Sequence, residues 1–276
     1  MEIGVYQSDS GSKRVLKKYA MEEVFYQSKL SWDVLMQIAD DYEKKIVKFQ
    51  KIAIDYVNQL NALPQVHSVR YRLKDVEHLI EKIIRKTIEY EDTEVVYNVD
   101  TYLVEITDII GIRALYVFKS DYLPLHNAII KKYKKNFCEK PQVKLREGDD
   151  KKLYAGLKNV EFQIDSMYRS IHYTIRAIED EIIVPIEIQT RSIFEEGWSE
   201  INHKLLYKNS TLTLDEEILL KQASSILSSL AGDCDTLGEL MANILHKEEE
   251  IDFIQDNHNL NRSKIFDELI TGSKKN

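Results

Sequence analysis

Three polar side chains at alternate positions mark one segment of the chain as a candidate for chemistry. In Val184–Lys208, the residues Glu187, Gln189 and Arg191 alternate with uncharged positions. Alternate residues of a strand lie on the same face, so a carboxylate, an amide and a guanidinium would share that face. Such a combination is typical of an active-site edge, although the solvated outer face of an edge strand has the same pattern.

A helix is expected directly after this strand. Phe194, Trp198, Ile201 and Leu205 follow one another at spacings of four, three and four residues, which makes one apolar stripe along a helix. The polar face of the strand and the amphipathic helix would therefore be neighbours.

A cluster of cations lies in residues 69–86, where the pattern predicts a short strand or turn followed by a helix. Its cations are Arg72, Lys74, Lys82, Arg85 and Lys86. At a strand-to-helix junction, such side chains are well placed to bind phosphates through charge-assisted hydrogen bonds. Ordinary pairing along the helix, for example of Glu81 with Arg85, accounts for the same pattern.

The segment Asp108–Phe118 is almost continuously apolar, which predicts a buried central strand. Arg113 interrupts it, and an arginine in a core strand is costly unless it is paired or used. Arg113 is therefore a candidate site residue. Asp108 precedes the strand and could either pair with Arg113 or hold a metal ion together with a second carboxylate.

Another strand is predicted over Met167–Ala177, with His172 on its polar face. Tyr168 and Arg169 stand at the entrance of this strand. A tyrosine beside cations at a strand mouth could stack on a base while the cations bind phosphates. An ordinary packed tyrosine is the alternative.

The other periodicities predict mainly helices. A long amphipathic helix is expected over residues 35–60, and further helices are expected over residues 121–135 and 219–244. Residues 91–107 are expected to form a loop and an edge element. The C-terminal thirty residues are expected to be partly disordered or to form a small helix around Ile265–Ile270.

Composition limits the class of protein. The chain has 276 residues, of which 43% are apolar and 30% charged, as in soluble globular proteins. No apolar run is long enough to cross a bilayer, and the N-terminus lacks the apolar core of a secretory signal. Cys138 and Cys234 have no metal-ligand spacing. We expect a cytoplasmic protein with reduced thiols and no membrane contact.

The charge is unevenly distributed. The net charge of −8 argues against broad binding of nucleic acids, but Lys131–Lys158 contains ten Lys or Arg against four Asp or Glu. An acidic protein with one basic stretch suits a polyphosphate ligand or an RNA end better than a long duplex. A solvated lysine-rich loop is the simpler alternative.

Four segments, in this order, resemble the synthetase domain of the RelA/SpoT-type alarmone synthetases. They read RLKDVEHLIEKIIRK, DIIGIRALYVF, YRSIHY and EIQTRSIFEEGWSEINHKLLYK, and they lie between Arg72 and Lys208. Members of this family move pyrophosphate from ATP to a nucleotide 3′-hydroxyl. The long bifunctional members of this family carry a hydrolase domain that contains a His-Asp dipeptide. This chain has no such dipeptide, so a small, synthetase-only member is expected.

The resemblance implies an α/β fold, with a nucleotidyltransferase-like mixed sheet of about five strands flanked by helices. It also implies three parts. We expect an N-terminal helical extension over residues 1–65, the synthetase domain over 66–210, and a C-terminal helical extension over 211–276. The C-terminal helix packs within the chain or mediates formation of a homo-oligomer.

Roles for single residues follow from the resemblance on the donor side. Arg72 and Arg113 would sandwich the adenine of ATP, while Lys74, Lys82 and Arg85 would hold its phosphates. In the same way, Asp108 and Glu187 would ligate Mg²⁺, a hard cation that prefers carboxylate and phosphate oxygens. Whether Glu187 also accepts the hydroxyl proton is left open.

On the acceptor side, the resemblance assigns Tyr168 to stacking on the acceptor base. The residues that would position its phosphate or ribose are Arg169, His172, Gln189 and Arg191. Three residues belong to the helix that would close the site, namely Asn202, His203 and Lys204. Met167 stands where the family usually has glycine, so the acceptor side departs from the family more than the donor side does.

Three functions are compatible with these patterns. The leading one is a GTP pyrophosphokinase that makes (p)ppGpp from ATP and GDP or GTP. The first alternative is a toxic small synthetase, with an antitoxin partner, that makes (p)ppApp or modifies the 3′ end of tRNA through Lys131–Lys158. The second is a non-catalytic nucleotide-binding or RNA-binding module, which the intact pair of Asp108 and Glu187 disfavours.

Overall fold

The structure of the chain is a computed structural model. It describes residues 16–17, 21–89, 95–154, 156–165, 167–179, 182–206 and 212–272. Side chains are described up to residue 245, apart from those at 152, 153 and 206.

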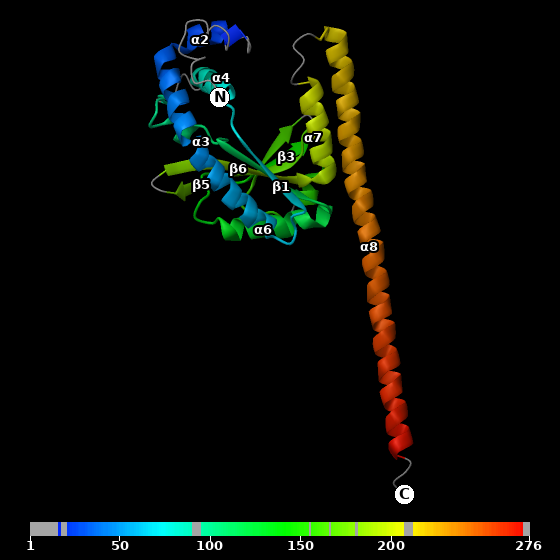
Figure 1. Cartoon of the computed structure of the whole chain (residues 1–276). Helices are drawn as coiled ribbons and strands as arrows, with labels where there is room; N and C mark the ends of the chain where they lie inside the picture. The colour runs from blue at the N-terminus through cyan, green and yellow to red at the C-terminus, as the bar shows by residue number, and fades with distance from the viewer. Residues whose placement is uncertain are drawn as a thin grey trace.

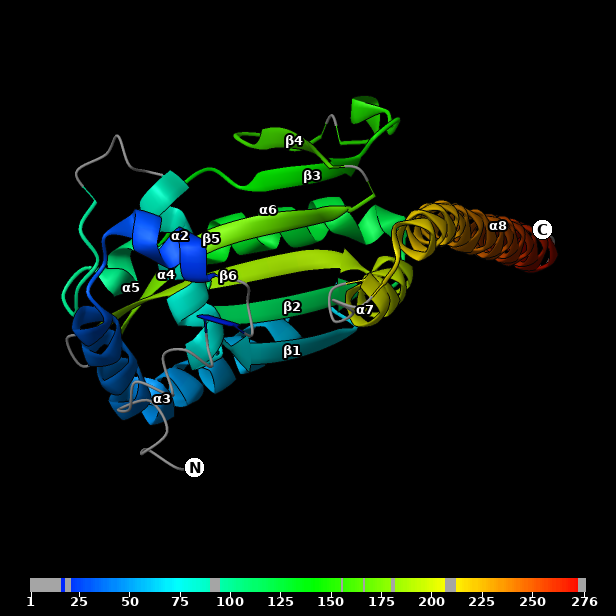
Figure 2. The same cartoon turned by 90° about the horizontal axis from the view of Figure 1, so that it is seen from above.

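A mixed sheet of six strands forms the centre of the fold, in the order β1-β2-β6-β5-β3-β4 (Figure 2). The strands are β1 (Ser68–Leu73), β2 (Ile110–Tyr116), β3 (Gln142–Arg146), β4 (Glu161–Asp165), β5 (Ser170–Glu179) and β6 (Ile182–Ser192). The pairs β2–β6 and β3–β4 are parallel and the other pairs are antiparallel. The predicted α/β class is confirmed, with one strand more than the roughly five expected.

Helices cover both faces of the sheet. They are α2 (Glu22–Ser28), α3 (Trp32–Asn61), α4 (Val76–Glu89), α5 (Tyr102–Glu105), α6 (Tyr122–Lys132), α7 (Ile193–Leu206) and α8 (Leu214–Gly272). Two short 3₁₀ turns are η1 (Lys119–Asp121) and η2 (Lys151–Tyr154). The helices α4 and α7 stand on one face, which we call the upper face, and α6 lies on the other together with part of α3 (Figures 1 and 2).

The long N-terminal helix α3 follows from the sequence pattern. Ser31 caps it, because the Ser31 side chain accepts a hydrogen bond from the backbone N–H of Asp33. Its apolar face is fully buried, with Leu35, Tyr42 and Phe49 all at 0% exposure. This burial anchors α3 against β1, β2 and α4, as the spacing of apolar residues predicts.

Alternation along β5 decides which side chains belong to which face. Tyr173 points to the lower face, where its hydroxyl lies 3.2 Å from Nδ1 of His126 on α6. His172 points to the upper face, toward Glu187 of β6. The two faces therefore separate a packed core under the sheet from a polar region above it.

Two expectations about local structure were wrong. The described part of the segment 91–107 contains the short helix α5 in place of an edge element. The basic stretch is not one loop, because it contains the end of α6, the strand β3 and the turn η2. Lys144 is the lysine of β3, and it alternates with the buried Val143 and Leu145 in a pattern that is only a few residues long.

The C-terminal segment is one continuous helix, and Gly232 does not interrupt it. A Cβ at Gly232 would come within 3.3 Å of the Arg169 guanidinium, so the glycine admits this close approach. The small helix expected around Ile265–Ile270 is part of α8, whose far end extends well beyond the body of the molecule (Figure 1). Within the described residues, no helix is long and apolar enough to cross a membrane.

The first half of α8 is fixed to the body by polar contacts. Trp198 of α7 donates from Nε1 to the carbonyl of Ser224 at 2.9 Å. Below it, the Ser192 hydroxyl donates to Asp235 at 2.8 Å, and the Ser192 backbone N–H donates to Glu195 at 3.0 Å. Burial, and then the charge of Asp235, raises the pKa of the Glu195 carboxyl to about 7.

The raised pKa of Glu195 predicts a dependence of stability on pH. The folded state binds this proton more tightly than the unfolded state, so the contribution of Glu195 is complete below pH 4.5 and is lost as the pH rises through about 7. Replacing Glu195 by Gln should raise the free energy of unfolding at pH 8 by roughly 2–3 kcal/mol and flatten its pH dependence. Urea unfolding at pH 5, 6, 7 and 8 measures both effects. Equal slopes against pH for the two proteins would contradict the prediction.

Candidate active site

A cavity of about 350 Å³ opens on the upper face between β1, β2 and α7. We call it the upper cavity. It is lined by Arg70, Tyr71, Arg72, Gly111, Ile112, Arg113, Gln189, Glu200, His203 and Lys204. The sequence-predicted residues Arg72, Arg113, Gln189, His203 and Lys204 thus meet at one place, and Arg70 joins them without having been predicted.

Strand register brings the two arginines together. Arg72 of β1 lies opposite Gly111 of β2, and Arg113 lies opposite Gln189 of β6. A Cβ at Gly111 would come within 3.3 Å of the Arg72 side chain, so the glycine lets that side chain lie across the neighbouring strand. Gly111 therefore leaves room for Arg72 over β2, and Arg113, two residues later, projects from β2 itself.

A carboxylate between two lysines lies at the start of β2. Asp108 binds Lys74 at 2.7 Å and Lys82 at 2.9 Å, and all three side chains are less than one-fifth exposed. Burial by itself raises the pKa of Asp108, but the two lysines hold it below its usual value. Asp108 is therefore ionised at neutral pH and pairs with the predicted phosphate-binding lysines rather than with Arg113.

A second carboxylate, Glu187, is held by an ordered chain of hydrogen bonds. His172 lies 3.0 Å from Glu187 through Nδ1, and Tyr168 lies 3.2 Å from Nε2 of the same imidazole. Because a carboxylate only accepts, Nδ1 of His172 donates the hydrogen bond to Glu187. Gln189 also donates to Glu187 at 2.6 Å. These four residues were all predicted for the site.

The hydrogen bonds around Glu187 decide its charge. Burial by itself raises the pKa of Glu187, but the bond and charge of His172, the bond from Gln189 and the charge of Lys82 lower it to about 2. Lys82 therefore acts on both Asp108 and Glu187. Both carboxylates are therefore ionised at neutral pH.

Arg191 is buried behind this network rather than open to the cavity. Its side chain is 1% exposed, and its Nη2 donates to the Tyr168 hydroxyl at 2.6 Å and also to Gln189. The guanidinium lies 4.9 Å from the centre of the Tyr168 ring. Arg191 therefore positions Tyr168 and Gln189, and Glu196 at 3.3 Å balances its charge.

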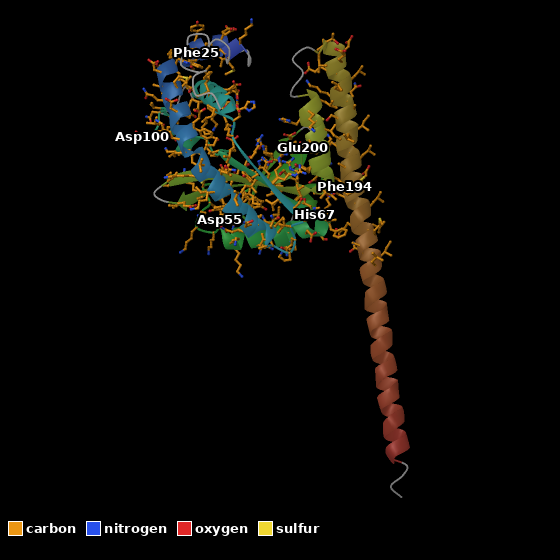
Figure 3. All side chains as sticks on the ribbon, in the orientation of Figure 1. Phe25, Asp55, His67, Asp100, Phe194 and Glu200 are labelled. Carbon is orange, nitrogen blue, oxygen red and sulfur yellow. The ribbon has the colours of Figure 1, made fainter. Side chains whose placement is uncertain are left out.

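The helix α7 is joined to β2 by ion pairs that the sequence reading missed. Arg113 binds Glu196 at 2.9 Å and also binds Glu200, which Figure 3 marks on α7 above the sheet. The two glutamates are four residues apart and so lie on one face of the helix. That spacing was visible in the sequence and could have identified them as partners of Arg113.

Three predicted residues lie away from both the upper cavity and the hydrogen-bonded groups around Asp108 and Glu187. Arg85 pairs with Glu81 at 3.3 Å and with Glu89 at 2.8 Å along the surface of α4, which is the alternative that the sequence left open. Asn202 turns toward α8, where it accepts a hydrogen bond from the Ser224 hydroxyl at 2.6 Å.

Arg169 is the third of these residues. It donates to both carboxylate oxygens of Asp149, at 2.7 and 2.8 Å, and to the carbonyl of Ser228 on α8 at 3.0 Å. Arg169 and Asp149 border a second cavity of about 340 Å³ beside α8, which shares no lining residue with the upper cavity. Tyr168 therefore belongs to the hydrogen bonds around Glu187, whereas the adjacent Arg169 borders the second cavity. Successive side chains of an extended segment point to opposite sides.

One positioning residue comes from outside the four recognised segments. The Tyr42 hydroxyl on α3 donates to the carbonyl of Lys74 at 2.5 Å, and its ring is fully buried. Lys74 in turn binds Asp108. Helical periodicity correctly assigned Tyr42 to the apolar face, but it carries no information about the partner of a buried hydroxyl.

Comparison with known proteins agrees with this geometry. The sequence profile of the family described as "Region found in RelA / SpoT proteins" matches residues 71–212. The chain belongs to the RelA/SpoT family. The match contains every residue that forms the upper cavity apart from Arg70.

Individual members of the RelA/SpoT family are distant from this chain. GTP pyrophosphokinase YwaC of Bacillus subtilis (strain 168) is 24% identical over 184 residues, which cover 65% of this chain and 76% of the relative. Small alarmone synthetase 1 from Bacillus subtilis has a similar structure, with a TM-score of 0.55 and 19% identity over 75% of this chain and 99% of that one. The same enzyme bound to its product pppGpp gives a TM-score of 0.51 at 22% identity, over 75% of this chain and 97% of that one.

The hydrogen bond from the Tyr42 hydroxyl to the carbonyl of Lys74 can be tested by substitution. Replacing Tyr42 by Phe removes the hydrogen bond to Lys74 and should lower the free energy of unfolding by about 1 kcal/mol. Tyr56 on the same helix is a matched control, because its hydroxyl has no hydrogen-bond partner among the described residues. Urea unfolding followed by circular dichroism measures both variants, and equal losses for the two would contradict the assignment.

Proposed function

We propose that this protein is a pyrophosphokinase that transfers the β,γ-pyrophosphate of ATP to the 3′-hydroxyl of GDP or GTP, with release of AMP. One observation carries the proposal, namely that the arginine-lined upper cavity adjoins the group formed by Asp108, Lys74, Lys82 and Glu187. Planar guanidinium groups on the two sides of a ring suit a purine. Lysines beside carboxylates suit phosphates and a metal ion.

ATP would enter the upper cavity by exchanging partners. Arg113 is bound to Glu196 and Glu200 of α7, and Lys74 and Lys82 are bound to Asp108. An adenine ring would take Arg113 from α7, and phosphates would take the two lysines from Asp108. The two lysines would exchange one anionic partner for another, and Glu196 would keep Arg191 as a partner at 3.3 Å.

The carboxylates fit a bound Mg²⁺. Asp108 and Glu187 are ionised, they offer hard oxygen ligands, and both are under the influence of Lys82. When bound, the metal would neutralise charge on the triphosphate. Release of the lysines to the phosphates would free the Asp108 oxygens for this role. The RelA/SpoT family is in general dependent on Mg²⁺.

The acceptor would lie on the Tyr168 side of Glu187. In the transfer, a bond forms between the 3′-oxygen and the β-phosphorus, the bond from the β-phosphorus to the α-phosphate oxygen breaks, and AMP leaves. The chain of Tyr168, His172 and Glu187 holds its three members in one hydrogen-bonded arrangement before the acceptor arrives. Alignment of this kind, with charge neutralisation, accounts for most catalysis of phosphoryl transfer.

The relatives support the choice of nucleotides. One relative carries the name GTP pyrophosphokinase, and structures of small alarmone synthetase 1 from Bacillus subtilis are described with bound pppGpp and with bound AMPCPP. A guanine nucleotide as acceptor and an adenine nucleotide as donor are therefore the first substrates to test.

The experiment is a transfer assay with γ-labelled ATP and Mg²⁺, in which GDP, GTP, ATP and deacylated tRNA are offered in parallel. The label lies in the transferred pyrophosphate, so its position identifies the acceptor. Label on GDP or GTP supports the proposal, and label on ATP indicates (p)ppApp synthesis. Binding of ATP without any transfer would contradict the enzymatic function.

Glu187 gives a sharp control for this assay. Glu187→Gln keeps an oxygen that can accept from His172 but removes the negative charge, and the rate of transfer should fall at least about a hundredfold. Glu179→Gln, at the far end of β5, removes the charge of a surface glutamate that pairs with Lys51 and should leave the rate unchanged. Equal rates for the two variants would contradict the role of Glu187.

A tRNA 3′ end is the second candidate acceptor, because several lysines of the basic stretch are exposed. Lys140, Lys151 and Lys158 are exposed on the connections around β3 and β4. The neighbouring Lys131 and Lys132 are also exposed, but they belong to α6 under the sheet. The two groups of lysines can therefore be tested separately.

Charge reversal distinguishes the two groups. If tRNA is the acceptor, Lys151→Glu with Lys152→Glu should abolish transfer to tRNA and leave ATP binding unchanged, since charge attracts the phosphate backbone. Lys131→Glu with Lys132→Glu is the matched control and should retain transfer. Loss of transfer in both double variants would show a general charge effect and exclude a specific acceptor surface.

A further inference from the structure

The ion pair between Glu196 and Arg191 is buried but incompletely formed. The two residues are 6% and 1% exposed, and Oε2 of Glu196 lies 3.3 Å from Nη1 of Arg191. Within the described part of the chain, neither of these atoms has a hydrogen-bond partner, and Nε of Arg191 has none either. Buried polar atoms without partners are rare and costly, so this arrangement requires an explanation.

The contact of Glu196 with Arg113 explains why the pair is incomplete. The other oxygen of Glu196, Oε1, accepts a hydrogen bond from Nη1 of Arg113 at 2.9 Å. A bidentate pair of a carboxylate with a guanidinium uses both carboxylate oxygens, and Arg113 occupies one of them. Glu196 is therefore shared between an arginine of the upper cavity and an arginine buried behind that cavity.

Arg191 in turn supports the side chain of Tyr168. Its Nη2 donates to the Tyr168 hydroxyl at 2.6 Å, and its guanidinium lies 4.9 Å from the centre of the Tyr168 ring. Tyr168 is not among the residues that line the upper cavity. The contacts of Glu196 and Arg191 therefore connect the upper cavity to the side of the site that the proposed function gives to the acceptor.

We propose that Glu196 is a positioning residue that couples the two substrates, so that each binds more tightly when the other is present. The inference rests on the proposed function, in which the adenine of ATP takes Arg113 from α7. Departure of Arg113 frees Oε1 of Glu196, and the whole carboxylate then becomes available to the N–H groups of Arg191 that lack partners.

Completion of this pair prepares the acceptor side for its ligand. An Arg191 guanidinium held by two oxygens of Glu196 has less freedom, and so has the Tyr168 ring that it supports. A base that stacks on a ring already held in place loses less conformational entropy on binding, which raises its affinity. Coupling of binding free energies is reciprocal, so the acceptor must raise the affinity of ATP by the same factor.

The test measures binding of GDP to the full chain by isothermal titration calorimetry with Mg²⁺, without and with saturating AMPCPP. This ATP analogue has a carbon bridge between its α- and β-phosphorus atoms, so no transfer occurs. GDP should bind at least about fivefold more tightly in the presence of AMPCPP, and AMPCPP should gain the same factor from GDP. Glu196→Gln should reduce both factors to about one, because an amide cannot form the bidentate pair with Arg191.

Glu200→Gln is the matched control. It removes the other carboxylate that binds Arg113 but leaves the contact between Glu196 and Arg191, so it should keep the wild-type coupling factor. Circular dichroism verifies that both variants are folded. Coupling that Glu196→Gln leaves intact, or GDP affinity that AMPCPP does not change in the wild-type protein, would overturn the inference without touching the proposed transfer activity. Absence of AMPCPP binding would instead contradict the proposed function together with this inference.

A second measurement does not depend on the identity of the acceptor. Nuclear magnetic resonance of protein labelled with nitrogen-15 arginine detects the side-chain N–H groups of Arg191, and comparison with Arg191→Lys assigns them. AMPCPP alone should shift these signals in the wild-type protein and leave them in place in Glu196→Gln. Arg191 signals that bound AMPCPP does not move in the wild-type protein would overturn the inference for any acceptor.

Discussion

The parallel pairing of β2 with β6 is the constraint on which the site depends. It sets Gly111 beside Glu187 and Arg113 beside Gln189, so that residues from two segments far apart in the sequence project from one face. Side chains alternate along a strand, and a slip of one residue would turn Glu187 and Gln189 into the core and bring Ile186 and Ile188 to the surface. The full burial of Ile186 and Ile188 therefore protects the position of the polar residues between them.

Electrical balance is a second property of the site. Its cations and carboxylates neutralise one another before any ligand is bound, with Asp108 between two lysines and Arg113 between two glutamates. Unpaired charges at this depth would destabilise the fold, so pairing lets the protein keep a dense group of charges with only modest cost. The same pairing joins α4 to the segment that precedes β2, and α7 to β2 itself.

Much of the fold was predictable because strong periodicities decide it. The helices α3, α4, α6 and α7, and the strands β2, β5 and β6, appear where apolar spacing predicted them. The short strands β3 and β4 were missed, since five residues offer too little pattern. For the site, residue types and the recognised segments identified most members, but the direction of Arg169 and the hydroxyl partner of Tyr42 depend on tertiary packing that no local pattern encodes.

The length of α8 also determines how this protein moves through solution. With 59 residues the helix is about 88 Å long, several times the width of a single helix, and its far part extends beyond the body (Figure 1). Friction on a body with such a rod is greater than on a sphere of equal mass. Its elution volume and rotational correlation time will therefore correspond to a larger compact protein, and retention time alone will exaggerate the number of copies that travel together.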